Sequence, residues 1–288
     1  MTATQTSVHA TLTIGAVAGW VCSPARLSSP ASFVFCFHGG GYTADYFDFS
    51  APGLADYSMA EHLAQLGHVV VAFDQPGIGA SATVEDGTTL SVDVVTDAHH
   101  RATSDVLHRA RLGTLLPDIG PLDEVTTTGL GHSMGGSLLV VQQGRHRTFD
   151  RIATLGTTAL PREWGGEFAF DVQGGFARFD RAALRHGFYW DDVPEDVVAA
   201  DERIGAAMPM GILDAPQVAR SLATSIDVPL FLGFAERDVS PSPHREVSLY
   251  TGSRDVTLHV LPGSGHCSNF ASGRRALWDR LSNWMISV

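Results

Sequence analysis

The sequence predicts an α/β protein with a mostly parallel, doubly wound sheet that is interrupted by a helical cap insertion. Two observations lead to this fold class. Short, continuous apolar runs recur along the chain, and such runs are typical of strands that are covered on both faces. Segments with helical spacing of apolar residues lie between most of these runs, and this alternation favours a doubly wound sheet. The 288 residues, 44% of them hydrophobic and 17% charged, suit one large α/β domain.

The first predicted element is a pair of strands. The stretch "LTIGAVAGWVC" at 12–22 alternates in polarity, so it predicts two strands that turn at Gly15 or Gly19. No positive charge precedes it, which argues against a signal peptide. Six further runs are apolar and rich in β-forming residues, and they are the predicted strands of the main sheet. They lie at 32–37, 68–73, 124–130, 151–156, 228–234 and 256–261.

Four predicted helices alternate with these strands. Their apolar residues recur at helical spacing, and the first two segments end at a glycine, which is a favourable residue just beyond a helix. They lie at 54–67, 93–113, 137–146 and 273–288.

Residues 157–225 interrupt the alternation, because they contain no clear core strand. They hold glycines, many aromatic residues and two helical stretches, at 194–208 and 215–225, where Pro194 suits the first helical position. A long insertion between two sheet strands is usually functional, so we interpret it as a helical cap. Residues 1–156 and 226–288 then form the core domain. The alternative is a set of extra helices packed at the edge of the sheet.

The aromatic residues of this insertion are candidates for substrate contact. Trp164, Phe168 and Trp190 suggest an apolar or aromatic substrate of small to medium size. The alternative is that they form the insertion's own core.

Charge and cysteine content limit the possible partners and compartment. The formal net charge is −12, and all 19 basic residues are arginine. An acidic balance without basic runs argues against nucleic acid and anionic membrane as partners. Three cysteines do not form a disulfide framework and fit a reducing compartment. No apolar run reaches the ~18 residues of a membrane span. We expect a cytoplasmic protein that acts on a small molecule, and the sequence leaves its oligomeric state open.

The stretch "GHSMG" at 131–135 places Ser133 between two glycines, after a predicted strand and before a predicted helix. In a G-x-S-x-G motif in this context the serine is a nucleophile on a tight, strained turn. Ser133 is therefore the candidate nucleophile. The alternative is an ordinary loop.

A nucleophilic serine needs donors for the oxyanion that forms during attack. "FCFHGGGY" places glycines at the end of an early strand, where bare amides can approach a substrate oxygen. We expect the amide of Gly40, with Gly41 beside it, to act together with the amide of Met134. A phosphate loop is the weaker interpretation, because there is no GxGxxG spacing and no P-loop lysine.

The base and its acid partner are expected in two loops after late strands. His266 lies in "GSGHCSNF", a short loop that follows the last predicted strand, at the sheet edge where α/β sites lie. The loop "FLGFAERDVSPSP" offers two carboxylates. We choose Asp238, deeper in that loop, as the group that orients His266, with Glu236 as the alternative.

These residues resemble the α/β-hydrolase superfamily over essentially the whole chain. Nucleophile, acid and histidine follow in the superfamily's order, as Ser133, Asp238 and His266. "FDQPGIGAS" at 73–81 is similar to the Asp-x-x-Gly-x-Gly-x-Ser turn after the fourth strand of many capped members. "HGGGY" resembles the hormone-sensitive-lipase-like esterases, whereas "GHSMGG" resembles capped esterases, lactonases and carbon–carbon hydrolases. The resemblance implies the α/β-hydrolase fold.

The residues and the resemblance together predict hydrolysis of a carboxylic ester through an acyl-enzyme intermediate. No organic cofactor is implied, and no metal, since the histidines show no HxxxH or HxH pair. The alternatives are carbon–carbon bond hydrolysis, a lactonase or cofactor-free perhydrolase, and a ligand-binding receptor on the same scaffold. Dehalogenase and epoxide hydrolase chemistry is disfavoured, because those enzymes have an aspartate in place of Ser133.

Overall fold

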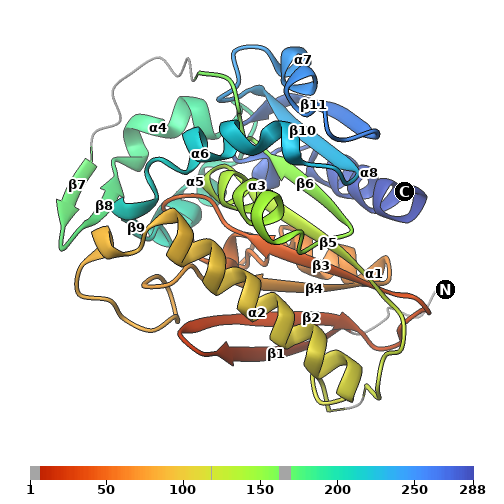
Figure 1. Cartoon of the computed structure of the whole chain (residues 1–288). Coiled ribbons are helices and arrows are strands. Elements are labelled where there is room, and N and C mark those ends of the chain that lie inside the picture. Colours follow the sequence, from red (N-terminus) through yellow and green to blue (C-terminus); the bar gives the residue numbers. More distant parts are fainter. Residues whose placement is uncertain (1–6, 118, 162–169) are drawn as a thin grey trace.

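The computed structural model describes residues 7–117, 119–161 and 170–288. Its main sheet has eight strands (Figure 1). They are β1 (Ser7–Ile14), β2 (Val17–Pro24), β3 (Ala31–Phe37), β4 (His68–Phe73), β5 (Val125–His132), β6 (Arg151–Leu155), β10 (Leu230–Arg237) and β11 (Val256–Gly265). The strand order is β1-β2-β4-β3-β5-β6-β10-β11. The first two strands pair antiparallel with their neighbours, and those from β4 to β11 are parallel. The predicted fold class is confirmed.

Each predicted strand of the main sheet is present. The N-terminal pair turns at Gly15, which has a φ of +61°, whereas Gly19 lies within β2. The six later runs correspond to β3, β4, β5, β6, β10 and β11.

The helices of the main domain are α1 (Met59–Gln65), α2 (Val92–Leu112), α3 (Met134–His146), α7 (Pro243–Glu246) and α8 (Arg274–Ser287). Two starts differ from the prediction by more than one residue. The first helix begins at residue 59 rather than 54, because the Ser58 side chain accepts a hydrogen bond from the Glu61 amide and caps it there. The third begins at Met134 rather than 137, because Gly135 and Gly136 adopt helical geometry in place of a turn.

Side chains of β3 show how the sheet is covered on both faces. Phe33, Phe35 and Phe37 belong to an apolar cluster that includes residues of α2 and α3. Val34 and Cys36, which point to the opposite face, belong to a second cluster with residues of α1 and α8. The continuous apolar run therefore reports burial on two sides, as expected for a parallel sheet.

The insertion contains more than helices. Its helices are α4 (Arg181–Phe188), α5 (Glu195–Arg203) and α6 (Ala215–Leu222). An antiparallel sheet of β7 (Phe170–Gln173), β8 (Phe176–Phe179) and β9 (Met208–Pro209) accompanies them, and Figure 1 shows β7, β8 and α4 together at one side of the molecule. This sheet was not expected from the sequence.

Two details of the insertion refine the sequence interpretation. Pro194 is the N-cap of α5 rather than its first helical residue, a shift of one position at a helix boundary. Helix α6 packs against α3, and its Ala215 and Ala219 belong to the core cluster of the main sheet. That residues 157–225 act as a cap stays a prediction.

The part of the chain that the structure describes contains no helix with the length and apolar character of a membrane span.

Candidate active site

Ser133 lies on a sharp turn between β5 and α3. The strand ends at His132 and the helix begins at Met134, so one residue makes the change of direction. Ser133 has a φ of +53° and a ψ of −119°, a combination that a non-glycine residue rarely adopts. A strained serine in a strand–turn–helix arrangement is the geometry of a nucleophile elbow.

The two glycines of the motif make this turn possible. A Cβ at Gly131 would lie 2.5 Å from the Cα of Gly136, and a Cβ at Gly135 would lie 2.2 Å from the carbonyl oxygen of Phe37. Both distances are too short for carbon or oxygen contacts, so neither position accepts a side chain without movement of the backbone. The absence of a side chain at these two positions is therefore a steric requirement of the turn.

Three side chains from separate loops form one hydrogen-bonded chain. The Nε2 atom of His266 lies 2.9 Å from the Oγ of Ser133, and its Nδ1 lies 2.7 Å from Oδ1 of Asp238. The side chains of His266 and Asp238 are 4% and 2% exposed, so water does not compete for these bonds. Only one tautomer, with the proton on Nδ1, donates to the carboxylate and leaves Nε2 as the acceptor.

Backbone amides hold the Asp238 carboxylate in place. Its Oδ2 accepts a hydrogen bond from the Ala235 amide and its Oδ1 from the Val239 amide, each at 2.7 Å. Glu236 has a different role, because its carboxylate accepts from the amide of Gly263 at 2.8 Å. The structure thus brings Asp238, and not Glu236, to the ring of His266.

The loop of His266 is bonded to the insertion. The amide of His266 donates to the carbonyl of Gly187 at 2.9 Å, and the amide of Cys267 donates to the carbonyl of Phe188 at the same distance. Both acceptors lie in the last turn of α4. The carbonyls at a helix end lack partners within the helix, so they are free to accept these bonds.

The predicted oxyanion donors separate into two groups. Gly40 and Met134 line the pocket above Ser133. The Met134 amide begins α3, so it has no acceptor within the helix and carries the positive end of the helix dipole. Gly41 instead faces the insertion. Its carbonyl accepts from the amide of Ala206 at 2.8 Å, and Phe179 occupies the space where its Cβ would be.

Two buried residues support the site without a clear sequence signal. His132 donates from Nε2 to the carbonyl of His266 at 3.1 Å and stacks on Tyr46 at 4.5 Å. Burial, together with the nearby His266, lowers the pKa of His132 well below its usual value, so its ring is neutral. Thr157 donates to the carbonyl of Ser133 at 2.9 Å. The hydrogen bond of His132 could not be read from the sequence, because its acceptor lies 134 residues away.

A cavity of about 80 Å³ lies above Ser133. The insertion contributes many of its walls, and residues of the core domain, both polar and apolar, form the remainder. The described residues that line it are Gly40, Tyr42, His132, Ser133, Met134, Ser137, Gly156, Thr157, Thr158, Phe170, Phe179, Phe188, Met208, Leu213, Val239 and His266.

Of the three predicted aromatic contacts, only Trp190 lies within the described residues. Trp190 lies outside the described lining, and its ring packs under the guanidinium of Arg237 at 4.6 Å. Trp164 and Phe168 lie outside the described residues. The described insertion residues at the cavity include Phe179 and Phe188 instead.

Within residues 7–117, 119–161 and 170–288, no three side chains of His, Cys, Asp or Glu gather where they could hold a metal ion. All three cysteines are buried and unpaired.

The fold and this arrangement of side chains define an α/β protein with a hydrolase-type site, and comparison with known proteins supplies the family. The profile of the alpha/beta hydrolase family matches residues 33–279. The chain belongs to this family, and membership supports hydrolase activity. A search of curated protein sequences finds no significant match.

Solved structures share the fold at low sequence identity. A monoacylglycerol lipase from Paleococcus ferrophilus aligns with a TM-score of 0.63 at 16% identity, covering 98% of this chain and 99% of the lipase. The methylesterase MES16 from Arabidopsis aligns with a TM-score of 0.61 at 18% identity, covering 90% of this chain and 100% of the other. A thioesterase domain from the curacin biosynthetic pathway aligns with a TM-score of 0.60 at 18% identity, covering 98% and 100%. At such identity the likeness shows the fold alone.

Proposed function

We propose that this protein is a serine hydrolase that cleaves a small, neutral carboxylic ester through an acyl-enzyme intermediate. The observation that carries the proposal is the hydrogen-bonded chain from Asp238 through His266 to Ser133, which ends at an apolar pocket. A serine hydroxyl is a weak nucleophile until a base takes its proton, and this chain supplies the base and its orienting acid.

In the first half of the reaction Ser133 Oγ attacks the ester carbonyl carbon while His266 Nε2 takes its proton. Asp238 stays ionised and stabilises the imidazolium through the Nδ1–H bond. The carbonyl oxygen becomes an oxyanion, which the amides of Gly40 and Met134 bind. The C–O bond to the alcohol then breaks, His266 gives its proton to the leaving oxygen, and the acyl group remains on Ser133.

In the second half a water molecule replaces the alcohol. His266 takes a proton from this water, the hydroxide attacks the acyl carbon, and the same two amides bind the new oxyanion. Collapse of the intermediate returns the proton to Ser133 Oγ and releases the carboxylic acid. The two half-reactions together consume one ester and one water, and they regenerate the starting protonation states.

The pocket supports a small and neutral substrate. Its volume of about 80 Å³ is below the ~150 Å³ of an apolar cavity that accepts benzene. Phe170, Phe179, Phe188 and Met208 supply apolar walls, and none of the described lining residues is Asp, Glu or Arg. An acyl group of a few carbons fits these dimensions, whereas a charged acyl group would lose its hydration without gaining a partner.

Hydrolysis of p-nitrophenyl acetate, butyrate and octanoate tests the proposal, with Ser133→Ala as the matched control. We expect kcat/KM to be highest for the short esters, and the variant to lose at least about 10³-fold in kcat, since the serine, histidine and acid act as a unit. Equal rates for wild type and variant would contradict the proposal.

Two further substrates separate the related reactions. A lactone or a vinylogous diketone that is turned over faster than every ester would assign the same serine to ring opening or to carbon–carbon cleavage. Tight ester binding without turnover, unchanged in Ser133→Ala, would indicate a ligand-binding receptor.

A further inference from the structure

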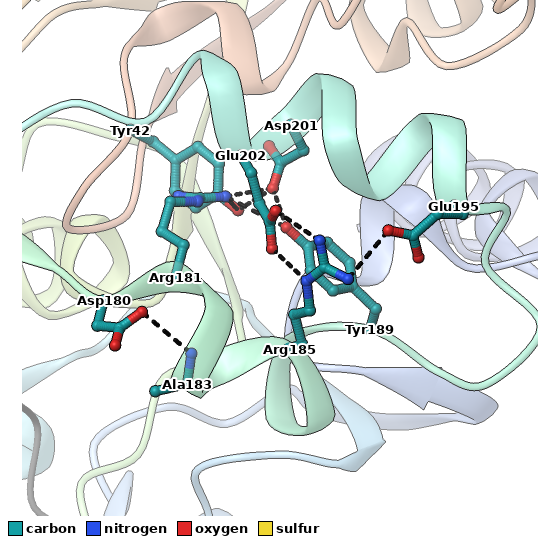
Figure 2. Close-up of polar contacts among 9 residues, drawn as sticks. All are labelled: Tyr42, Asp180, Arg181, Ala183, Arg185, Tyr189, Glu195, Asp201 and Glu202. Carbon is teal, nitrogen blue, oxygen red and sulfur yellow. Dashed lines mark hydrogen bonds and ion pairs between the residues drawn. The ribbon is translucent and has the colours of Figure 1, made fainter.

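A buried ion pair joins two helices of the insertion beside the loop that carries Gly40. Asp201 on α5 is fully buried, and its Oδ2 accepts hydrogen bonds from Arg181 on α4 and from the hydroxyl of Tyr189. The same oxygen accepts from the hydroxyl of Tyr42 at 2.9 Å. Figure 2 shows these side chains converging on one carboxylate, two of them from the two ends of α4 and the third from the loop of Tyr42.

Tyr42 connects this pair to the candidate oxyanion loop, because it follows Gly41 directly. Arg181 donates to the Tyr42 hydroxyl at 2.8 Å, and its guanidinium lies over the Tyr42 ring at 4.5 Å from the centroid. Burial and the neighbouring Asp201 raise the pKa of Tyr42 well above its usual value. The phenol is therefore protonated and able to donate to Asp201 while it accepts from Arg181.

The rest of the loop has contacts on both sides. A Cβ at Gly40 would lie 2.6 Å from Sδ of Met208, so the insertion closely covers that residue. A Cβ at Gly39 would lie 3.2 Å from the Cβ of Ser133 on the opposite side. The loop thus lies between the nucleophile and the insertion. Two contacts link it to the buried charges, namely the Tyr42 hydroxyl and a longer bond of 3.4 Å from Arg181 to the carbonyl of Gly41.

The charge of Asp201 depends on its partner. Burial raises the pKa of Asp201, and Arg181 opposes this effect. Burial alone would lower the pKa of Arg181, but Tyr42 and Asp201 raise it overall. A buried pair of this kind is weak evidence for net stability, because desolvation of both charges offsets their attraction. Its directional hydrogen bonds, in contrast, permit only one arrangement of Tyr42.

We propose that Arg181 and Asp201 are positioning residues, which hold Tyr42 and thereby keep the Gly40 amide aimed at the oxyanion of the reaction. This inference rests on the proposed serine hydrolase function and adds two residues of the insertion to it. Since an oxyanion donor binds the transition state more strongly than the substrate, loss of the positioning lowers kcat and leaves KM nearly unchanged.

The test compares two pairs of matched variants with p-nitrophenyl butyrate. Tyr42→Phe and Tyr189→Phe each remove one hydroxyl from Asp201, but only Tyr42 belongs to the loop. Arg181→Met and Arg185→Met each remove an ion pair between α4 and α5. Arg185 bonds Glu202 and Glu195 without contacting Tyr42 (Figure 2).

We expect Tyr42→Phe and Arg181→Met to lower kcat by about 10- to 100-fold, somewhat less than the removal of a whole oxyanion donor. KM should change by less than about threefold, and the controls Tyr189→Phe and Arg185→Met should retain kcat within about threefold. A boronic acid that forms a tetrahedral adduct on Ser133 should lose affinity in step with kcat/KM, because its oxygen occupies the same position as the oxyanion. If Arg181 and Asp201 only stabilised the fold, the affinity for the boronic acid would not fall together with kcat/KM across the variants.

Equal losses in Tyr42→Phe and Tyr189→Phe, or a rise in KM with unchanged kcat, would overturn the proposal. The two tyrosine variants keep their rings, so they remain informative if Arg181→Met does not fold. Failure of the hydrolase function itself has a separate signature, namely that wild type turns over no faster than Ser133→Ala. That outcome would overturn the positioning role as well.

Discussion

At the scale of single residues, Asp238 shows how a backbone determines the chemistry of a side chain. Its two oxygens accept bonds from the amides of Ala235 and Val239, so the carboxylate cannot rotate. The remaining acceptor position on Oδ1 faces the Nδ1–H of His266. The carboxylate of Glu236, two residues earlier, accepts a hydrogen bond from the Gly263 amide near the end of β11.

This arrangement predicts the effects of Asp238→Asn and Glu236→Gln. In either orientation an asparagine amide would point its NH2 group at one of the two backbone amides. Its single oxygen cannot accept hydrogen bonds from both of them. We expect kcat to fall by about 10³- to 10⁴-fold, as for other triads that lose the acid. The matched change Glu236→Gln retains an oxygen acceptor for Gly263, and kcat should stay within about threefold. Steady-state kinetics on one ester checks both, and a larger loss for Glu236→Gln would reverse the assignment.

At the scale of elements, the turn from β5 into α3 depends on close backbone contact with β3. The position of Gly135 against the carbonyl of Phe37 allows the helix to begin directly behind the central strands. The amide of Met134 is thereby placed at the pocket, on the first turn of the helix. The close packing of α3 against β3 and the position of the Met134 amide both follow from the absence of a Cβ at Gly135.

Gly135→Ala tests this dependence. A Cβ 2.2 Å from the Phe37 oxygen requires movement of α3 or β3, and overpacking of this kind costs about 1–3 kcal/mol. We expect a lower free energy of unfolding in urea and a loss of kcat of at least about tenfold. Gly53→Ala is a suitable control, because its Cβ would meet nothing within 4 Å, although its positive φ adds some strain. A fully active Gly135→Ala variant would contradict this account of the turn.

The sequence predicted the main sheet and the hydrogen-bonded chain because each has a local signal. Continuous apolar runs report burial on both faces, and Ser133 and His266 follow strands in Gly-rich loops. The sheet of the insertion lacks such a signal, since all four residues of β7 are exposed and β9 has two residues. The Arg181–Asp201 pair could not be predicted from the sequence for another reason. Its two residues lie on different helices, and its proposed role depends on Tyr42, which is far away in the chain.

At the scale of the whole molecule, charge is strongly unbalanced. The chain has a formal net charge of −12, whereas the described lining of the pocket includes no Asp, Glu or Arg. A field of this sign lowers the local concentration of anionic ligands and acts over roughly one Debye length, about 10 Å at 0.1 M salt. It therefore affects the encounter with a substrate more than the chemical step.

The consequence is a selective dependence on salt. For an anionic ester, such as the p-nitrophenyl ester of a dicarboxylic acid, kcat/KM should rise by about two- to fivefold between 10 mM and 300 mM sodium chloride. A neutral ester of equal acyl length should show little change over this range. Rates measured at substrate concentrations far below KM provide the comparison, and an equal response of both esters would contradict it.

The hydrogen bonds from the amides of His266 and Cys267 to the end of α4 limit how the insertion can be exchanged in protein engineering. An attractive way to change specificity is to exchange the whole insertion for that of a relative, as if it were an independent module. Here the insertion supplies the carbonyls of Gly187 and Phe188 to the histidine loop. A chimaera must therefore inherit the last turn of α4 together with the core, and the useful boundary for exchange lies inside the insertion rather than at its ends.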